Sequence, residues 1–192
     1  KCPMARRRNG AIFSAFAVLV VALLCAGVTA GVHHGLAGAF EQSDLALDEA
    51  KGGAQRKLLF PDATSFESQS APAVEGLNSV YKADTGAWVF DVTSAQGYHG
   101  DVELMIGINA DGTVAGIQVV AEDETDGIGT NALTEEYFGG FAGSPAAGEL
   151  TVDEAGADQT HVDAVSGATF TSRAVVDCLN IAFAAYAQMG GN

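Results

Sequence analysis

Hydrophobic residues follow two different patterns along this chain. Residues 11–32 contain no charged side chain, and a run of this length can form a helix that crosses the roughly 30 Å hydrocarbon core of a bilayer. After residue 86, short apolar runs alternate with polar positions and glycine-rich turns, which is typical of a folded domain. The pattern therefore predicts one transmembrane helix at 11–32, followed by a globular domain.

Positive charge before the apolar run predicts the orientation of that helix. Arg6, Arg7 and Arg8 precede it, so the positive-inside rule places residues 1–10 in the cytoplasm and the globular domain outside it. A cleavable signal peptide also has a basic start and an apolar centre, and residues 28–30 resemble a cleavage site. We favour a retained single-pass anchor in the cell membrane, in contact with the lipid bilayer.

Residues 33–60 are predicted to form a juxtamembrane connector that ends in a helix. Apolar positions between Asp44 and Leu59 recur at helical spacing, and Phe60-Pro61 ends the pattern. The extracytoplasmic domain is then expected to comprise residues 61–192.

A mainly antiparallel sheet is predicted at the centre of this domain. Residues 87–94 are rich in aromatic and β-branched side chains, and residues 102–108 alternate as in a half-buried strand. The sequence Asn-Ala-Asp-Gly at 109–112 predicts a hairpin turn, after which 113–122 form the returning strand. Because such a sheet buries one face against helices, the predicted fold class is α+β.

Three shorter predictions complete the domain: a helix at 135–141, a strand at 161–165, and a helix from Thr171 or Ser172 to about Met189. The last helix has an apolar stripe at three- and four-residue spacing. Its members are Val175, Leu179, Ala182, Phe183 and Tyr186.

Charge and cysteine content exclude several classes of function. The formal net charge is −15, and all 24 acidic residues lie after residue 32, so the domain would repel nucleic-acid phosphates. The three cysteines, Cys2, Cys25 and Cys178, fall in separate segments and have no metal-binding spacing. We expect no nucleic-acid partner and no metal site.

Candidate chemistry lies in residues 163–176, DAVSGATFTSRAVV, where small residues precede the last helix. Helix N-termini carry unpaired N–H groups and hold phosphate well, and Thr169 could present its hydroxyl there. Arg173 in the first turn opposes the helix dipole unless an anion lies beside it. The alternative is that Ser166, Thr171 or Ser172 caps the helix and nothing binds. The residues alone leave both interpretations open.

The stretch Asp163 to Thr169 resembles the flavinylation motif of the FMN-binding domain family, and this resemblance implies FMN bound covalently to Thr169 through a phosphoester. Residues 96–120 are similar to the family's glycine-rich entry into a strand hairpin, and residues 122–133 to its Glu-Thr-x-Gly-x-Gly segment. Asp126 departs from the proline that is frequent in that segment. The residues that the resemblance implies around the flavin are Gly100, Glu124, Thr125, Gly127, Gly129, Ser166, Gly167 and Ala168.

Two neighbours of Gly100 are given no role. Tyr98 could stack on the flavin ring, but we expect an ordinary half-buried tyrosine at the end of a strand. His99 has no visible acid–base partner. No catalytic residue is assigned, because the flavin would carry the redox chemistry.

Within the family, the chain looks most like the G subunits of Rnf-type ion-translocating electron-transport complexes. The resemblance implies a flavoprotein that relays electrons between ferredoxin and NAD, coupled to sodium or proton movement, with other subunits and a flavin transferase as partners. Similarity to the C subunit of the sodium-pumping NADH:quinone reductase leaves that complex, or another extracytoplasmic reductase, as an alternative. A second alternative is an anchored scaffold module without flavin.

Overall fold

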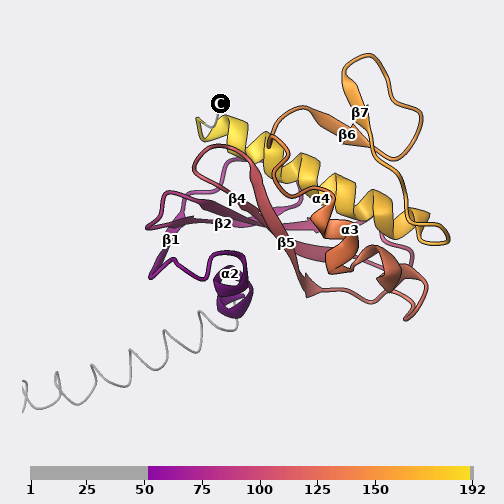
Figure 1. Cartoon of the computed structure of the whole chain (residues 1–192), viewed down its shortest axis with the longest axis horizontal. Coiled ribbons are helices and arrows are strands. Elements are labelled where there is room, and N and C mark those ends of the chain that lie inside the picture. The colour runs from indigo at the N-terminus through magenta and orange to yellow at the C-terminus, as the bar shows by residue number, and fades with distance from the viewer. Residues whose placement is uncertain (1–51, 191–192) are drawn as a thin grey trace, which may run out of the picture. The chain divides into compact units, whose positions relative to one another are not determined.

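The computed structural model describes residues 52–190 of the 192-residue chain. These residues belong to a single compact unit (Figure 1). The transmembrane helix predicted at 11–32 lies outside the described residues. Between residues 52 and 190, no helix is both long and apolar enough to cross a membrane.

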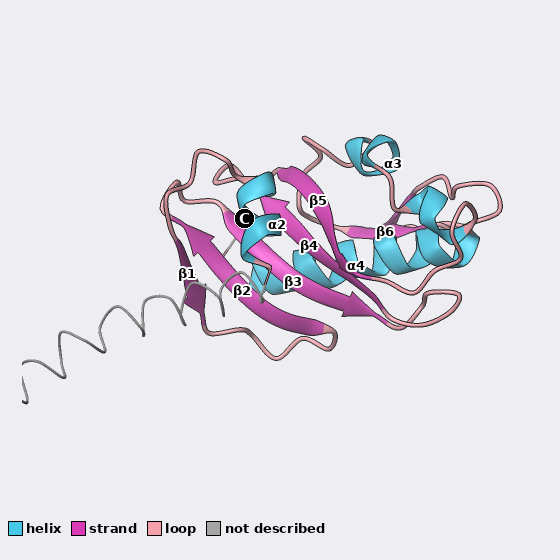
Figure 2. Ribbon diagram, turned by 90° about the horizontal axis from the view of Figure 1, so that it is seen from below, coloured by secondary structure: helices cyan, strands magenta, loops and turns pink. Residues whose placement is uncertain are grey.

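A five-stranded antiparallel sheet forms the centre of the unit, and its strands are ordered as they follow in sequence (Figure 2). The mainly antiparallel sheet and three of its strands confirm the prediction, whereas the first two strands were not predicted. The strands are β1 (Phe66–Gln69), β2 (Leu77–Ala83), β3 (Trp88–Ser94), β4 (Val102–Ile108) and β5 (Val114–Ala121).

The predicted hairpin turn joins β4 to β5. The N–H of Asn109 donates to the carbonyl of Thr113 at 2.8 Å, and the N–H of Gly112 donates to the carbonyl of Asn109 at 2.9 Å. Gly112 has φ +82°, a left-handed conformation that glycine adopts without strain. The turn sequence thus fixes the register of these two neighbouring apolar strands.

One face of the sheet is covered by α4 (Thr169–Gln188), which crosses β3 and β4 (Figure 1). The predicted apolar stripe of this helix is buried against the sheet. Phe90 on β3 meets Tyr186 on α4 edge to face, with ring centroids 6.2 Å apart. This layer is the main hydrophobic core and it holds the start of α4 in place.

The opposite face of the sheet carries α2 (Gly53–Leu59). Leu59 and Phe60 pack there against a smaller cluster that includes Tyr81 and Met105. The helix ends before Pro61 as predicted, but it does not continue through Gly52, whose φ of +82° is left-handed. The remainder of the helix predicted from Asp44 lies outside the described residues.

The segment between β5 and α4 contains α3 (Glu135–Gly139), which agrees with the predicted short helix, and the single-turn 3₁₀ helix η1 (Gly129–Ala132). It also contains two parallel strands, β6 (Glu149–Thr151) and β7 (Gln159–His161). The strand predicted at 161–165 is wrong beyond His161. There the backbone N–H of Val165 donates to the Ser172 hydroxyl at 3.0 Å instead of joining a strand.

Candidate functional site

Three chain segments that lie far apart in sequence are joined by the carboxylate of Glu124. Its Oε1 accepts hydrogen bonds from the backbone N–H groups of Tyr98 at 2.7 Å and His99 at 3.3 Å, in the loop after β3. Its Oε2 accepts one from the Thr171 hydroxyl, at 2.6 Å, in the first turn of α4. Glu124 itself follows β5 and is buried. The carboxylate therefore connects the three segments that the resemblance had singled out.

Two glycines allow this close approach. A Cβ on Gly129 would lie 2.4 Å from Oε2 and 2.9 Å from Cβ of Glu124, and 3.0 Å from the Thr171 hydroxyl. A Cβ on Gly97 would lie 2.2 Å from the carbonyl oxygen of Gly100 and 2.7 Å from Oε1 of Glu124. Glycine is required at both positions because any side chain would displace the buried carboxylate.

The connection into α4 is a tight turn. The N–H of Ala168 donates to the carbonyl of Val165 at 2.9 Å, and Gly167 has φ +83° as the third residue of a four-residue turn requires. A Cβ on Gly167 would meet nothing within 4 Å, so the outer side of this turn is open. Ser166 and Thr169, on either side, are exposed.

No hydroxyl group caps α4 in the way that the alternative interpretation requires. Ala168 occupies the N-cap position and its side chain accepts no hydrogen bond. The Thr171 hydroxyl donates to Glu124, the Ser172 hydroxyl accepts from Val165, and Ser166 lies two residues before the cap. The alternative of a cap by one of these three residues is therefore wrong, and the N-terminus of a 20-residue helix has no side-chain cap at its positive end.

Arg173 has a protein anion beside it, which corrects the idea that its position indicates a bound ligand. Its Nη2 lies 2.5 Å from Oδ1 of Asp153, and its Nε donates to Oδ2 at 3.2 Å. Asp153 belongs to the loop between β6 and β7. The hydrogen bonds and charge of Arg173 hold the pKa of Asp153 below its usual value.

A cavity of about 380 Å³ lies where the three segments meet. Six of the predicted residues line it, whereas Gly100, Gly127 and Ser166 do not. Four of its lining residues were not among the predicted site residues: Tyr98, which is 63% exposed rather than half-buried, Ile128, Phe170 and Thr171. Its complete lining is Tyr98, Glu124, Thr125, Ile128, Gly129, Gly167, Ala168, Thr169, Phe170 and Thr171.

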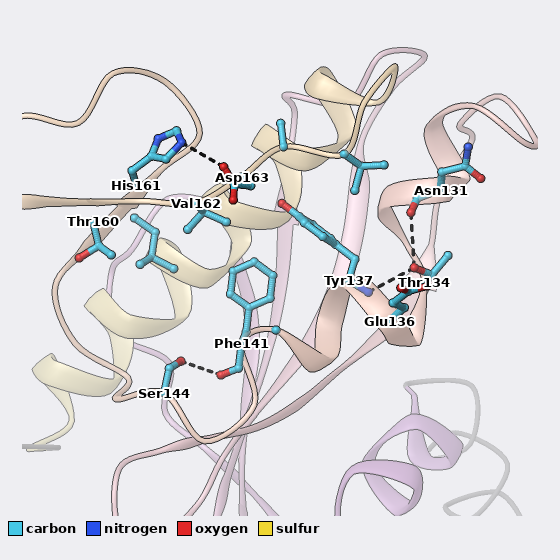
Figure 3. Close-up of a pocket in the computed structure, with 14 residues that line it drawn as sticks. Asn131, Thr134, Glu136, Tyr137, Phe141, Ser144, Thr160, His161, Val162 and Asp163 are labelled. Carbon is cyan, nitrogen blue, oxygen red and sulfur yellow. Dashed lines mark hydrogen bonds and ion pairs between the residues drawn. The ribbon is translucent and has the colours of Figure 1, made fainter.

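A larger cavity of about 740 Å³ lies between α3 and the connector that follows β7 (Figure 3). Tyr137 and Phe141 line it from one side, and His161 and Asp163 from the other. Burial raises the pKa of Tyr137. This cavity shares no lining residue with the one at Thr169 and contains none of the predicted flavin residues.

Comparison with known proteins first defines the class. Residues 97–184, which contain all three segments of the Thr169 cavity, match the FMN-binding domain. The chain therefore carries an FMN-binding domain. The first matched residue, 97, lies in the loop whose backbone is bound by Glu124.

Relatives that align over most of their length define the family. The chain is 30% identical to the G subunit of the ion-translocating oxidoreductase complex of Pseudoalteromonas atlantica, over 90% of this chain and 84% of that protein. It is 26% identical to the G subunit of the Na(+)-translocating ferredoxin:NAD(+) oxidoreductase complex of Acetobacterium woodii, over 90% and 89%. The chain belongs to the family of G subunits of ion-translocating oxidoreductase complexes.

Two further similarities are more partial. The G subunit of the proton-translocating ferredoxin:NAD(+) oxidoreductase complex of Clostridium ljungdahlii is 33% identical over 62% of this chain and 63% of that protein. The crystal structure of the C subunit of the Na(+)-translocating NADH-quinone reductase from Parabacteroides distasonis aligns with a TM-score of 0.45 at 22% identity, over 59% of this chain and 61% of that chain.

Proposed function

We propose that this chain is the flavoprotein subunit that relays electrons through FMN in an Rnf-type ferredoxin:NAD oxidoreductase complex coupled to ion translocation. The family and the FMN-binding domain support this function. The observation that carries it is the exposed Thr169 at the edge of a 380 Å³ cavity within that domain. Relatives are named for sodium and for proton translocation, so either ion fits the proposal.

The residues around Thr169 fit a phosphorylated flavin. The cavity lies in the range of about 300–1,000 Å³ that is usual for small-ligand sites. The open outer side of Gly167 lets a bulky group approach the backbone, and the uncapped start of α4 favours a negative charge at that place. The exposed Tyr98 and Phe170 add apolar surface for an aromatic ring.

Thr169 is the proposed attachment point. A flavin transferase would form an ester bond between the Thr169 hydroxyl oxygen and the phosphorus atom in the FMN half of FAD. The phosphoanhydride bond between the two halves of FAD breaks at the same time, and AMP leaves. The hydroxyl proton passes to solvent or to a base of the transferase. The phosphodiester product keeps one negative charge, which the helix N-terminus stabilises.

The chain contributes binding and positioning rather than a complete reaction. When bound, FMN supplies electron transfer in single steps. Glu124 and Gly129 hold the cavity walls together, whereas Gly167 and Ala168 keep the approach to Thr169 unhindered. We infer that electrons reach and leave this protein through other subunits of the complex.

Membrane attachment is the remaining part of the proposal. The apolar residues 11–32 would anchor the chain in the lipid bilayer with residues 1–10 in the cytoplasm. The FMN-binding domain would then lie on the extracytoplasmic side, near the membrane subunits with which it exchanges electrons.

Thr169→Val tests the attachment directly. The full chain and the variant are co-expressed with a flavin transferase, denatured, and examined by intact-mass spectrometry and in-gel flavin fluorescence. We expect the wild-type chain to gain the mass of one FMN group and to fluoresce, and the variant to do neither. Thr85→Val, at an exposed threonine in the turn between β2 and β3, is the matched control and should keep both signals. Fluorescence that survives in Thr169→Val would refute this site.

A further inference from the structure

Large apolar side chains gather around the Thr169 cavity. Between residues 52 and 190, four such side chains are more than half exposed, and three of them line this cavity: Tyr98 at 63%, Ile128 at 55% and Phe170 at 52%. The fourth, Leu58 at 68%, lies on α2. A cluster of exposed apolar side chains indicates a surface that binds a ligand, a membrane or another protein.

Four planar groups follow one another across this surface. The ring of His99 stacks on Tyr98, with centroids 5.0 Å apart and planes at 21°. Tyr98 lies next to Phe170, with centroids 5.7 Å apart and planes tilted by 48°. The guanidinium carbon of Arg173 lies 5.7 Å from the centroid of Phe170, and Asp153 holds that guanidinium by two hydrogen bonds. Asp153 therefore holds the Arg173 end of the series, and at the other end the backbone N–H of His99 donates to Glu124.

We propose that Tyr98 and Phe170, the aromatic pair, bind the flavin ring of the FMN on Thr169, and that Arg173 and Asp153 position Phe170 for this contact. The inference rests on the proposed function, since it requires a flavin at Thr169.

The backbone explains why these two rings can serve a ligand at this place. Phe170 directly follows Thr169 in the chain. Tyr98 comes from a distant loop, but Glu124 binds its N–H and at the same time binds the Thr171 hydroxyl. The buried carboxylate therefore fixes the two backbone segments that carry these rings relative to the attachment point. A flat aromatic ring gains free energy from offset or edge contacts with such neighbours.

The contact has a spectroscopic consequence. A tyrosine in contact with a flavin quenches its fluorescence by electron transfer in the excited state, and a bound ring tumbles with the protein. Loss of either aromatic side chain should reduce the ratio of bound to free ring by a factor of roughly 2 to 10, the range for aromatic pair contacts. Because both side chains are more than half exposed, their truncation removes little of the core.

The experiment uses the full chain co-expressed with a flavin transferase. Intact mass first establishes that each variant carries FMN. Flavin fluorescence of the folded sample is then divided by that of the same sample after denaturation, and anisotropy and quenching by acrylamide are measured in parallel. The variants are Tyr98→Ala, Phe170→Ala, Arg173→Ala and the conservative Tyr98→Phe. Leu58→Ala, at the exposed apolar residue outside the cavity, is the matched control.

We expect Tyr98→Ala and Phe170→Ala to raise the fluorescence ratio, lower the anisotropy and increase acrylamide quenching. Arg173→Ala should change the three quantities in the same direction by less, and Tyr98→Phe should keep the wild-type anisotropy. Wild-type values in all flavin-loaded variants would overturn the inference while leaving the proposed function intact. A wild-type chain without FMN would overturn both. If Phe170→Ala is not loaded because it adjoins Thr169, the distant Tyr98→Ala decides.

Discussion

At the scale of single residues, Glu124 organises the candidate site through three hydrogen bonds within the protein. The resemblance implies that it contacts the flavin, and it does line the cavity at Thr169. However, Oε1 accepts two backbone N–H groups and Oε2 accepts the Thr171 hydroxyl. A hydrogen bond to a charged group contributes about 1.5–3 kcal/mol to the net stability of a folded protein. Its role in this structure is to hold three segments at one place.

Gly129→Ala tests whether that arrangement depends on close packing. The added methyl group would lie 2.4 Å from Oε2 of Glu124 and 3.0 Å from the Thr171 hydroxyl, so one of the hydrogen bonds must lengthen. We expect a loss of about 1–3 kcal/mol in the free energy of unfolding, which is usual for overpacked sites, measured by urea titration.

The control for this variant is Gly139→Ala in α3, where the methyl group would meet nothing within 4 Å. Alanine favours the helix by up to about 1 kcal/mol, so this control should be neutral or slightly stabilising. Equal stability of Gly129→Ala and the wild type would show that Glu124 has room to move.

Sequence reasoning found the residues of the site that are defined by a motif and missed those defined by packing. Gly167, Ala168 and Thr169 are adjacent in the chain, so a single stretch identified them. The loop that carries Tyr98 is held by a hydrogen bond from the Tyr98 N–H to Glu124, 26 residues further along the chain. No local sequence pattern predicts this contact, so the exposure of Tyr98 was not predicted either. The sequence does contain an indication for Phe170: it is a large apolar residue in the first turn of α4 that lies outside the buried stripe of this helix, as expected for a residue that contacts a ligand.

At the scale of elements, the two faces of the sheet differ in chemistry. The face under α4 is mainly apolar, whereas the other face carries Asp91 and Glu103 as well as apolar groups. The amide of Asn78 donates to Oδ1 of Asp91 at 3.2 Å and to Oε1 of Glu103 at 3.4 Å. Burial in the first place, and the charge of Asp91 in the second, raise the pKa of Glu103.

Glu103→Gln tests the consequence of this raised pKa. The folded protein binds a proton at Glu103 more tightly than the unfolded chain does, so stability falls as the pH rises from the pKa of Glu103 in the unfolded chain through its raised pKa in the folded protein. We expect the variant to be more stable than the wild type at pH 7 and equal to it near pH 4, as measured by urea unfolding across this range. Glu67→Gln, at an exposed position of β1, should show no such pH-dependent gain. A gain that is independent of pH would contradict the explanation.

Arg56→Ala tests how α2 is attached to the sheet. Arg56 is fully buried, and its guanidinium carbon lies 4.0 Å from the ring centroid of Tyr81 and 5.8 Å from that of Phe66. Truncating a large buried side chain costs roughly 2–5 kcal/mol, and cation–π contacts are lost in addition. We expect faster hydrogen exchange throughout α2 and a lower free energy of unfolding.

Leu58→Ala, at an exposed position of the same helix, is the control and should leave both quantities nearly unchanged. If α2 exchanges equally fast in the wild type and in Arg56→Ala, Arg56 does not hold the helix on the sheet.

Periodicity predicted the elements with long regular patterns and failed for strands β2, β6 and β7. β3, β4, β5 and α4 have continuous apolar alternation or a helical stripe, and all four are present. β2 was missed because Asn78 and Ser79 interrupt its alternation, where the register with β3 also shifts. β6 and β7 have three residues each and depend on pairing with each other, which local sequence does not show.

At the scale of the whole molecule, the chain divides into residues 1–51 and residues 52–192. The first part contains the apolar run and the basic residues that precede it, and the second contains the FMN-binding domain. We propose that the first part keeps the flavin near its redox partners in the membrane, while the second determines where the flavin ring lies. The acidic surface of the second part would favour partner surfaces with positive charge.

The central claim is that Thr169 carries a phosphoester-linked FMN in the working protein. Intact-mass spectrometry of the chain isolated from its own membranes, followed by mass analysis of the peptide that contains Thr169, tests it without any engineered component. We expect one FMN group for each chain, and we expect it on that peptide. An unmodified polypeptide, or FMN on another peptide, would contradict the account.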